Sequence, residues 1–182
     1  MTITTTTEGR KTNRLLPRMP VPFLEVSTLD GGTWRLADQR PENFTMIVFY
    51  RGLHCPVCKA YLRDLDRRAE DFAARGVEVI ALSMDTKERA QQAKQEWGLQ
   101  HIAIGYGLSI AEAREWGLYI SRGIKEGEPA EFAEPGLFLV RPDGTLYAAA
   151  INTMPFARPS FNELLGALDF VIKNNYPARG AA

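Results

Sequence analysis

Met46-Ile-Val-Phe-Tyr-Arg-Gly-Leu-His-Cys-Pro-Val-Cys58 is the stretch that decides the fold of this chain. Its first five residues form a continuous apolar run, which is typical of a strand buried on both faces. Pro56 then opens a segment whose apolar residues recur on one side, which predicts an amphipathic helix from Pro56 to Arg75. The stretch therefore predicts a buried strand that leads directly into a helix, with two cysteines at the junction.

Two further apolar runs extend this unit into a sheet. Val77–Leu82 predicts a second buried strand, and a strand, a helix and a strand joined by short links form a parallel, right-handed crossover. Gly136–Val140 predicts a third central strand. It should form a hairpin with Thr145–Ala150, because the intervening Pro142-Asp143-Gly144 is a turn sequence. The sequence therefore predicts a single-domain α/β fold with a central mixed sheet flanked by helices.

The remaining segments are predicted to surround that sheet. Asp30-Gly31-Gly32 separates two short alternating runs, which indicates an N-terminal β-hairpin extension. Residues 121–134 are rich in Gly and Glu and predict a solvated surface loop; the alternative is a lip that contacts a substrate or partner. The other predicted elements are a helix from Asp85 or Thr86 to Trp97, a short strand at 101–104, and helices at Ser109–Trp116 and Ser160–Lys173.

The domain organisation is simple, because no linker or repeat divides the 182 residues. Residues 15–176 should form one domain, which is long enough to bury a core. The Thr-rich residues 1–14 predict a disordered arm, and residues 177–182 predict a frayed tail.

Composition excludes several classes of function. The 22 basic residues balance 22 acidic ones, so nothing indicates a nucleic acid or a charged membrane surface as partner. No apolar run approaches the ~20 residues of a membrane span. The N-terminus lacks the basic and apolar regions of a secretory signal, so we expect a cytoplasmic location. No glycine pattern for nucleotide binding is present, so no organic cofactor is implied.

Cys55 and Cys58 are the only cysteines of the chain, and they lie at the start of the predicted helix. A helix N-terminus carries unsatisfied N–H groups and a partial positive charge, which favour a thiolate. Residues three apart on a helix are close enough for a disulfide. The pattern therefore predicts a redox pair with a reversible disulfide. Cys55, at the cap, should have the better solvent access and the lower thiol pKa, because Cys58 should lie against the sheet.

Two other interpretations of the pair are open. The cysteines could be buried and inert, or they could form half of a zinc site. Zinc needs four ligands, and the only histidines are His54 and His101. His54 adjoins Cys55, which is a poor geometry, so a metal would have to be shared between two chains. His54 and Arg51 could instead add positive charge near Cys55, although His54 could equally be an exposed loop residue, and His101 and the three tryptophans are expected to have packing roles.

Several segments together resemble the alkyl hydroperoxide reductase / thiol-specific antioxidant (AhpC/TSA, peroxiredoxin-like) family, over roughly residues 20–173. The segment Phe49-Tyr-Arg-Gly-Leu-His-Cys-Pro-Val-Cys58 is similar to the active-site segment of that family. The hairpin segment 30–36, the segment 136–146 and the following Asn152–Arg158 resemble it in the same order. The resemblance implies a thioredoxin-like fold.

The active-site pattern departs from that of the family. Peroxiredoxins carry Pro-x-x-x-Thr-x-x-Cys; here the reactive Cys falls on Cys58, the Thr on Cys55 and the Pro on Arg51. One family arginine falls on Pro135, where proline resembles thioredoxin and implies a cis Glu134–Pro135 bond facing the cysteines. A second family arginine is matched by Arg158. The family pattern therefore makes Cys58 the attacking residue, whereas thioredoxin logic makes it Cys55.

The function expected from these features is that of a thiol-based oxidoreductase that cycles between a dithiol and a Cys55–Cys58 disulfide. It would act either as a peroxiredoxin-like antioxidant or as a thiol-disulfide reductase. Its partners would be a hydroperoxide or disulfide substrate and an electron-donor thiol protein or small thiol, with a homodimer as one possible assembly. The alternative is a redox-inactive binding or scaffold protein that keeps the fold without the chemistry.

Overall fold

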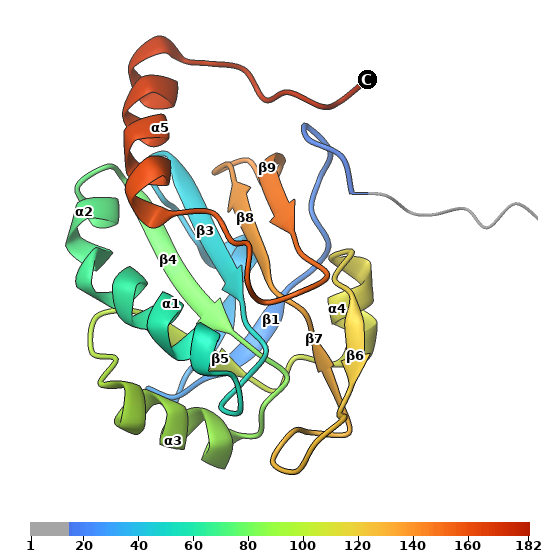
Figure 1. Cartoon of the computed structure of the whole chain (residues 1–182). Coiled ribbons are helices and arrows are strands. Elements are labelled where there is room, and N and C mark those ends of the chain that lie inside the picture. The colour runs from blue at the N-terminus through green and yellow to red at the C-terminus, as the bar shows by residue number, and fades with distance from the viewer. Residues whose placement is uncertain (1–14) are drawn as a thin grey trace, which may run out of the picture.

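Strand β3 (Phe44–Phe49) lies inside a seven-stranded mixed sheet (Figure 1). The computed structural model describes residues 15–182, so the predicted arm at 1–14 lies outside the described residues. The strand order is β2-β1-β5-β4-β3-β8-β9. The bounds of the other six strands are β1 Glu25–Thr28, β2 Thr33–Arg35, β4 Val77–Leu82, β5 Ala103–Tyr106, β8 Gly136–Val140 and β9 Leu146–Ile151.

The three predicted central strands are neighbours in this sheet. β3 pairs in parallel with β4, with Met46 opposite Val79. It pairs antiparallel with β8, with Ile47 opposite Phe138. The N-terminal hairpin β1–β2 also forms, and β1 joins the sheet by pairing antiparallel with β5. The prediction of a central mixed sheet with an N-terminal hairpin is therefore confirmed.

Side chains alternate along β3 and so supply two separate cores. Met46 and Val48 face a core that includes the two cysteines and Leu62, whereas Ile47 and Phe49 face the other side. The first core is covered by α1 (Pro56–Arg67), α2 (Ala69–Ala73), α3 (Lys87–Trp97) and α5 (Phe161–Asn174). The second is covered by α4 (Ile110–Glu115), a one-and-a-half-turn helix followed by the buried Trp116.

The predicted helix Pro56–Arg75 is wrong in one respect, because it is broken into α1 and α2. Arg68 lies between them with φ −103° and ψ 6°, outside the helical geometry. Its N–H bonds to the Leu65 carbonyl, three residues back, which tightens the end of α1. The apolar pattern continues past the break, since Phe72 is fully buried, so periodicity alone does not reveal it.

The predicted surface loop at 121–134 is wrong at its ends, although residues 123–130 carry no helix or strand and are mostly exposed. Its ends form a small antiparallel hairpin, β6 (Ile120–Arg122) and β7 (Glu131–Ala133), outside the main sheet (Figure 1). Phe132 and Glu134 are buried. Three-residue strands rich in charge give no alternating pattern, and they are held here by the burial of Phe132 rather than by local propensity.

The prediction of a cis Glu134–Pro135 bond is wrong, because the described chain contains no cis peptide bond. The trans form is the ordinary state of an X–Pro bond, since only about 5–6% of such bonds in folded proteins are cis. The Pro135 carbonyl accepts a hydrogen bond from the Asn152 N–H at 3.0 Å. The comparison with thioredoxin therefore rests on the Cys-x-x-Cys pattern alone.

The last residues carry no helix or strand, yet they contact the domain. Ala178 is buried, and its carbonyl accepts a hydrogen bond from Arg18 Nη2 at 3.0 Å. Tyr147 on β9 donates its hydroxyl to the Tyr176 carbonyl at 3.1 Å. These contacts hold part of the segment predicted to fray.

Candidate active site

Cys55 lies where β3 passes into α1, in the N-cap position of the helix. Its backbone is extended, and its sulfur accepts a hydrogen bond from the Cys58 N–H at 3.2 Å. Pro56 follows at the first helical position, where its missing N–H leaves no bond unmade. The local sequence thus places the Cys55 sulfur against the N–H groups of the first helical turn, where negative charge is stabilised.

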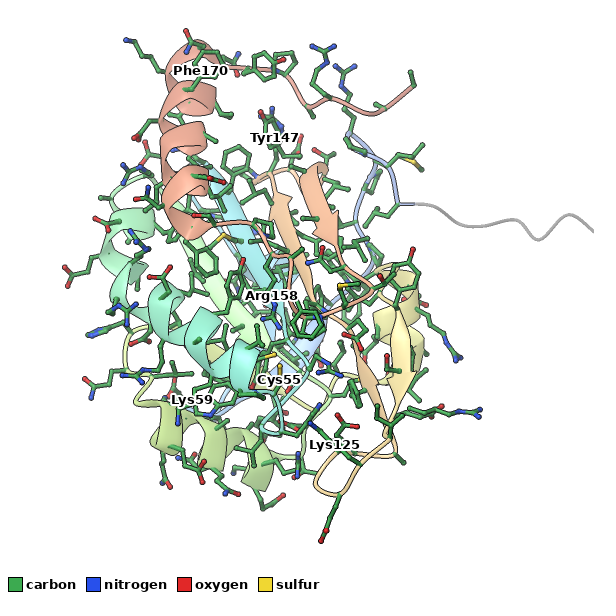
Figure 2. All side chains as sticks on the ribbon, viewed as in Figure 1. Cys55, Lys59, Lys125, Tyr147, Arg158 and Phe170 are labelled. Carbon is green, nitrogen blue, oxygen red and sulfur yellow. The ribbon has the colours of Figure 1, made fainter. Side chains whose placement is uncertain are left out.

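Arg158 joins the two cysteines from a distant part of the chain. Its Nη2 lies 3.1 Å from Cys58 Sγ and 3.8 Å from Cys55 Sγ. The guanidinium is held by its Nε, which donates to the Pro155 carbonyl at 2.7 Å, and by the ring of Tyr61, 5.0 Å from its centre. Figure 2 shows the side chain directed at the start of α1 beside Cys55. The structure thus brings three predicted site residues into one cluster.

The environment separates the two thiols electrostatically. The pKa of Cys55 is lowered to about 6, first by the hydrogen bond from the Cys58 thiol and further by the Cys58 N–H, Arg158 and Arg51. Burial raises the pKa of Cys58. These shifts favour ionisation of Cys55 over that of Cys58. The expected solvent access of Cys55 is wrong, since Cys55 is only 1% exposed and Cys58 0%.

Arg51 lies between the cysteine loop and the β6–β7 hairpin. Its Nε is 3.3 Å from Glu134 Oε2, and its Nη2 is 4.0 Å from Glu128 Oε1. The guanidinium also stacks on Phe132 at 4.6 Å from the ring centre. Two carboxylates therefore share the charge of Arg51 with the Cys55 thiolate.

His54 does not supply positive charge to Cys55. Its ring packs on Phe132 at a centroid distance of 4.6 Å, and the side chain is half-buried. Burial, followed by the charge of Arg51, lowers the pKa of His54. The imidazole is therefore neutral at pH 7, which contradicts the hypothesis of a cationic His54 as well as that of a freely exposed one.

Sequence reasoning missed Asp85, which holds the loop before Cys55. Thr86 caps α3, and the buried Asp85 instead accepts a hydrogen bond from the Leu53 N–H at 2.7 Å. One signal could have identified it. Asp85 follows β4 as Cys55 follows β3, and the carboxyl ends of adjacent parallel strands meet at one edge of a sheet. Tyr61, Phe132 and Glu134 carried no comparable signal.

Residues 15–182 contain no group of three or more His, Cys, Asp or Glu side chains arranged to hold a metal ion. Both cysteines are free thiols. Among the described helices, none is both long and apolar enough to cross a membrane.

Comparison with known proteins gives consistent matches. A family model with the description "AhpC/TSA family" matches residues 17–149. A protein of Mycobacterium tuberculosis (strain H37Rv), provisionally named a peroxiredoxin, is 27% identical over 146 residues, which cover 78% of this chain and 88% of the relative.

Solved peroxiredoxin structures share the fold. A cysteine-to-serine mutant of peroxiredoxin 6 from Arenicola marina superposes with a TM-score of 0.73 at 19% identity, covering 89% of this chain and 76% of that one. The reduced 2-Cys peroxiredoxin of Plasmodium vivax gives a TM-score of 0.73 at 16% identity, covering 89% and 84%. At this level of identity the likeness shows the fold, which is the thioredoxin-like fold implied by the sequence.

Proposed function

The chain belongs to the AhpC/TSA family, and from that premise we propose that it is a thiol-dependent peroxidase in which Cys55 attacks the peroxide and Cys58 resolves the product. The observation that carries this proposal is the division of the pair into a Cys55 thiolate and a Cys58 thiol beside one arginine. The thiolate is the nucleophilic form of cysteine, and a pKa near 6 leaves it ionised at neutral pH. A redox-inactive scaffold would have no need of this arrangement.

The reaction would proceed in two steps. The Cys55 thiolate attacks one oxygen of a hydroperoxide ROOH, so that an S–O bond forms, the O–O bond breaks, and an alkoxide leaves and takes a proton from water. The Cys58 sulfur then attacks the resulting sulfenic acid. A Cys55–Cys58 disulfide forms, and the hydroxyl leaves with the Cys58 proton as water. Two electrons from an external dithiol, or from two thiols, restore the starting state.

Burial of the sulfurs favours a peroxide over a protein disulfide as substrate. With exposures of 1% and 0%, neither sulfur can be reached by a disulfide on the surface of a folded protein without local opening. A groove of about 320 Å³ lies beside Arg158 and is lined mainly by apolar side chains, Val57, Ala60, Tyr61, Phe156, Pro159 and Phe161. It would accommodate the organic part of a small hydroperoxide.

Arg158 would assist the first step. One of its nitrogens contacts both sulfurs, whereas its Nη1 is buried without a hydrogen-bond partner in the described chain. A free N–H donor beside the nucleophile can bind the oxygen on which negative charge develops. The carboxylates on Arg51 leave Arg158 as the cation most available for this role.

The experiment compares wild type with Cys55→Ser and Cys58→Ser. In wild type, one equivalent of peroxide should convert two free thiols into one disulfide, and a dithiol should sustain peroxide consumption. In Cys58→Ser, a sulfenic acid should be trapped on Cys55 by dimedone, whereas Cys55→Ser should not react. A sulfenic acid trapped on Cys58 would support the family pattern, in which Cys58 attacks. Reduction of a model disulfide without peroxide consumption would favour a thiol-disulfide reductase.

The proposal also covers the electron donor, the cellular compartment and the oligomeric state. The donor would be a small thiol or a thiol protein in a reducing compartment such as the cytoplasm, where a cysteine pair stays reduced between cycles. Rates of peroxide consumption with dithiothreitol, glutathione or a thioredoxin system would distinguish these donors. Light scattering of the reduced and oxidised protein would test for a homodimer.

A further inference from the structure

Asp85 is a buried carboxylate whose two oxygens contact different elements. It is 3% exposed. Oδ2 accepts a hydrogen bond from the Leu53 N–H at 2.7 Å, and Oδ1 accepts one from Arg89 Nε at 2.9 Å. Its own backbone is also held, since its N–H donates to Ser83 Oγ at 3.2 Å and its carbonyl accepts from the Gly107 N–H at 2.9 Å. Hydrogen bonds to both its side chain and its backbone therefore hold Asp85 in place just after the end of β4.

Gly52 packs directly on this carboxylate. Its φ is +123°, and a Cβ at that position would lie 2.7 Å from Asp85 Oδ2 and 2.8 Å from Oδ1. Only glycine allows both the backbone conformation and the close approach. The Gly52 carbonyl in turn accepts a hydrogen bond from the Cys55 N–H at 3.1 Å. Asp85 is thus connected to Cys55 through the two loop residues that it contacts.

We propose that Asp85 is a positioning residue, which holds Gly52 and Leu53 so that Cys55 caps α1 within reach of Arg51 and Arg158. This role deepens the proposed function, on which its value for catalysis rests. The side-chain hydrogen bonds of Asp85 go to Leu53 and Arg89 rather than to either sulfur, so it acts through the loop. Arg89 keeps the carboxylate oriented, because a bond to a cation at one oxygen leaves the other free for Leu53.

The alternative is that Asp85 acts on Cys55 only through its charge, and the two roles have opposite consequences. A nearby carboxylate disfavours a thiolate, so removal of its charge alone would lower the pKa of Cys55. Loss of the loop geometry would instead raise it, because the N-cap position and the approach of Arg51 would be lost. The charged and titratable groups that influence Cys55 are Cys58, Arg158 and Arg51; those that interact with Asp85 are Arg89, Tyr50 and His54.

The test measures the rate of iodoacetamide alkylation of Cys55 against pH, in a Cys58→Ser background whose hydroxyl can still donate to Cys55. Asp85→Ala is expected to raise the apparent pKa by about one unit or more, toward the ordinary ~8.5. Alkylation at pH 6 should accordingly slow by about fivefold or more. Asp85→Asn keeps an amide oxygen that can accept from the Leu53 N–H and removes only the charge, so it should leave the pKa unchanged or lower it. Asp66→Ala in the same background is the matched control. Asp66 is also a buried carboxylate bonded to backbone N–H groups, but it lies at the other end of α1.

The control separates positioning from a general loss of stability. Asp66→Ala should lower the melting temperature and leave the alkylation profile unchanged. An unchanged or lowered pKa in a folded Asp85→Ala protein would overturn the proposal, as would an equal rise in Asp66→Ala. Should the Asp85 variants not fold, hydrogen exchange in wild type decides, because the Leu53 amide must be strongly protected. Exchange at the rate of an open loop would refute the proposal.

The readout does not depend on peroxide. A raised pKa in a protein that consumes no hydroperoxide would uphold the role of Asp85 and reject the proposed function. If the wild-type protein consumed peroxide and Asp85→Ala did not change the alkylation profile, the proposed function would stand and the role of Asp85 would be rejected.

Discussion

The two ends of helix α1 both carry buried polar groups, and they differ in how fully those groups are bonded. At the C-terminal end, Asp66 is 6% exposed and accepts hydrogen bonds from the N–H groups of Gln100, His101 and Ile102 at 2.8 to 3.2 Å. At the N-terminal end, Arg158 Nη1 and both ring nitrogens of His54 are buried without a hydrogen-bond partner in residues 15–182.

This difference in hydrogen bonding distinguishes a polar site with a structural role from one that can bind a reacting group. A buried carboxylate that is fully bonded holds a loop in place and leaves nothing to offer a ligand. Unpartnered donors beside a low-pKa thiol are unfavourable for stability and are typical of sites that bind a reacting group. We therefore expect substitution of Arg158 at the N-terminal end to change reactivity and substitution of Asp66 at the C-terminal end to change stability.

The largest effect is expected at Arg158. Arg158→Ala removes the contacts of 3.1 and 3.8 Å to the two sulfurs and the positive charge that favours the Cys55 thiolate. The second-order rate constant for peroxide should fall by about a hundredfold to a thousandfold, as for loss of an oxyanion donor. Arg158→Lys is the control, which keeps the charge and loses the planar donors, and should recover part of the rate. Stopped-flow kinetics in which both variants retain the wild-type rate would contradict the role.

Asp66→Ala tests the opposite end of the comparison. It leaves three backbone N–H groups without their acceptor, of which that of Ile102 is buried, so the free energy of unfolding should fall by about 1 to 3 kcal/mol. Denaturant melts measure this change. The rate per folded molecule should stay that of wild type. Asp64→Ala, which removes only surface ion pairs to Arg67 and Arg68, should change stability by less than about 1 kcal/mol. If Asp66→Ala and Asp64→Ala lowered the free energy of unfolding equally, the buried hydrogen bonds of Asp66 would not have the structural role assigned to them.

A matched pair at Cys58 tests the leading cause of the low pKa of Cys55. Cys58→Ser retains a side-chain donor to Cys55, whereas Cys58→Ala does not. The apparent pKa of Cys55 should therefore be higher in the Ala variant by about one unit. In both, alkylation should be fastest above the pKa and decline as the pH falls through it, since the thiolate is the reacting form. Superimposable profiles would show that the Cys58 thiol is not the dominant cause.

The smallest effect is expected at His54. Its pKa is lowered by burial and by Arg51, so the ring is neutral at pH 7 and should contribute no charge to Cys55. His54→Phe preserves the packing on Phe132 and should change the alkylation rate at pH 7 by less than about twofold. A marked loss, or the disappearance of an inflection below pH 6.5, would assign His54 a direct part in the chemistry.

The course of the chain through the sheet follows from local sequence. The runs that form β3, β4 and β8 are apolar and short, and the bounds of β4 and β8 agree with those read from the sequence. The N-cap position of Cys55 also follows from local signals, because a proline at the start of an amphipathic pattern marks the first helical position. Hydrophobic periodicity and capping act within a few residues, so they can be recognised without the fold.

Two of the sequence-based predictions are wrong because they concern features that depend on residues distant in the chain. The β6–β7 hairpin depends on Phe132 packing against Arg51 and His54, which lie about eighty residues earlier in the chain. The exposure expected for Cys55 failed for the same reason, because Arg158, which packs against its sulfur, lies 103 residues later in the chain.

The sequence by itself determined the sheet, the helix that follows its central strand, and a cysteine pair at the start of that helix. Only the tertiary structure decided which charged groups surround the pair and what holds the loop before Cys55. Arg158 and Asp85 reach the pair from other elements, and electrostatic and hydrogen-bonding effects depend on distances in space. Separation along the chain does not encode those distances.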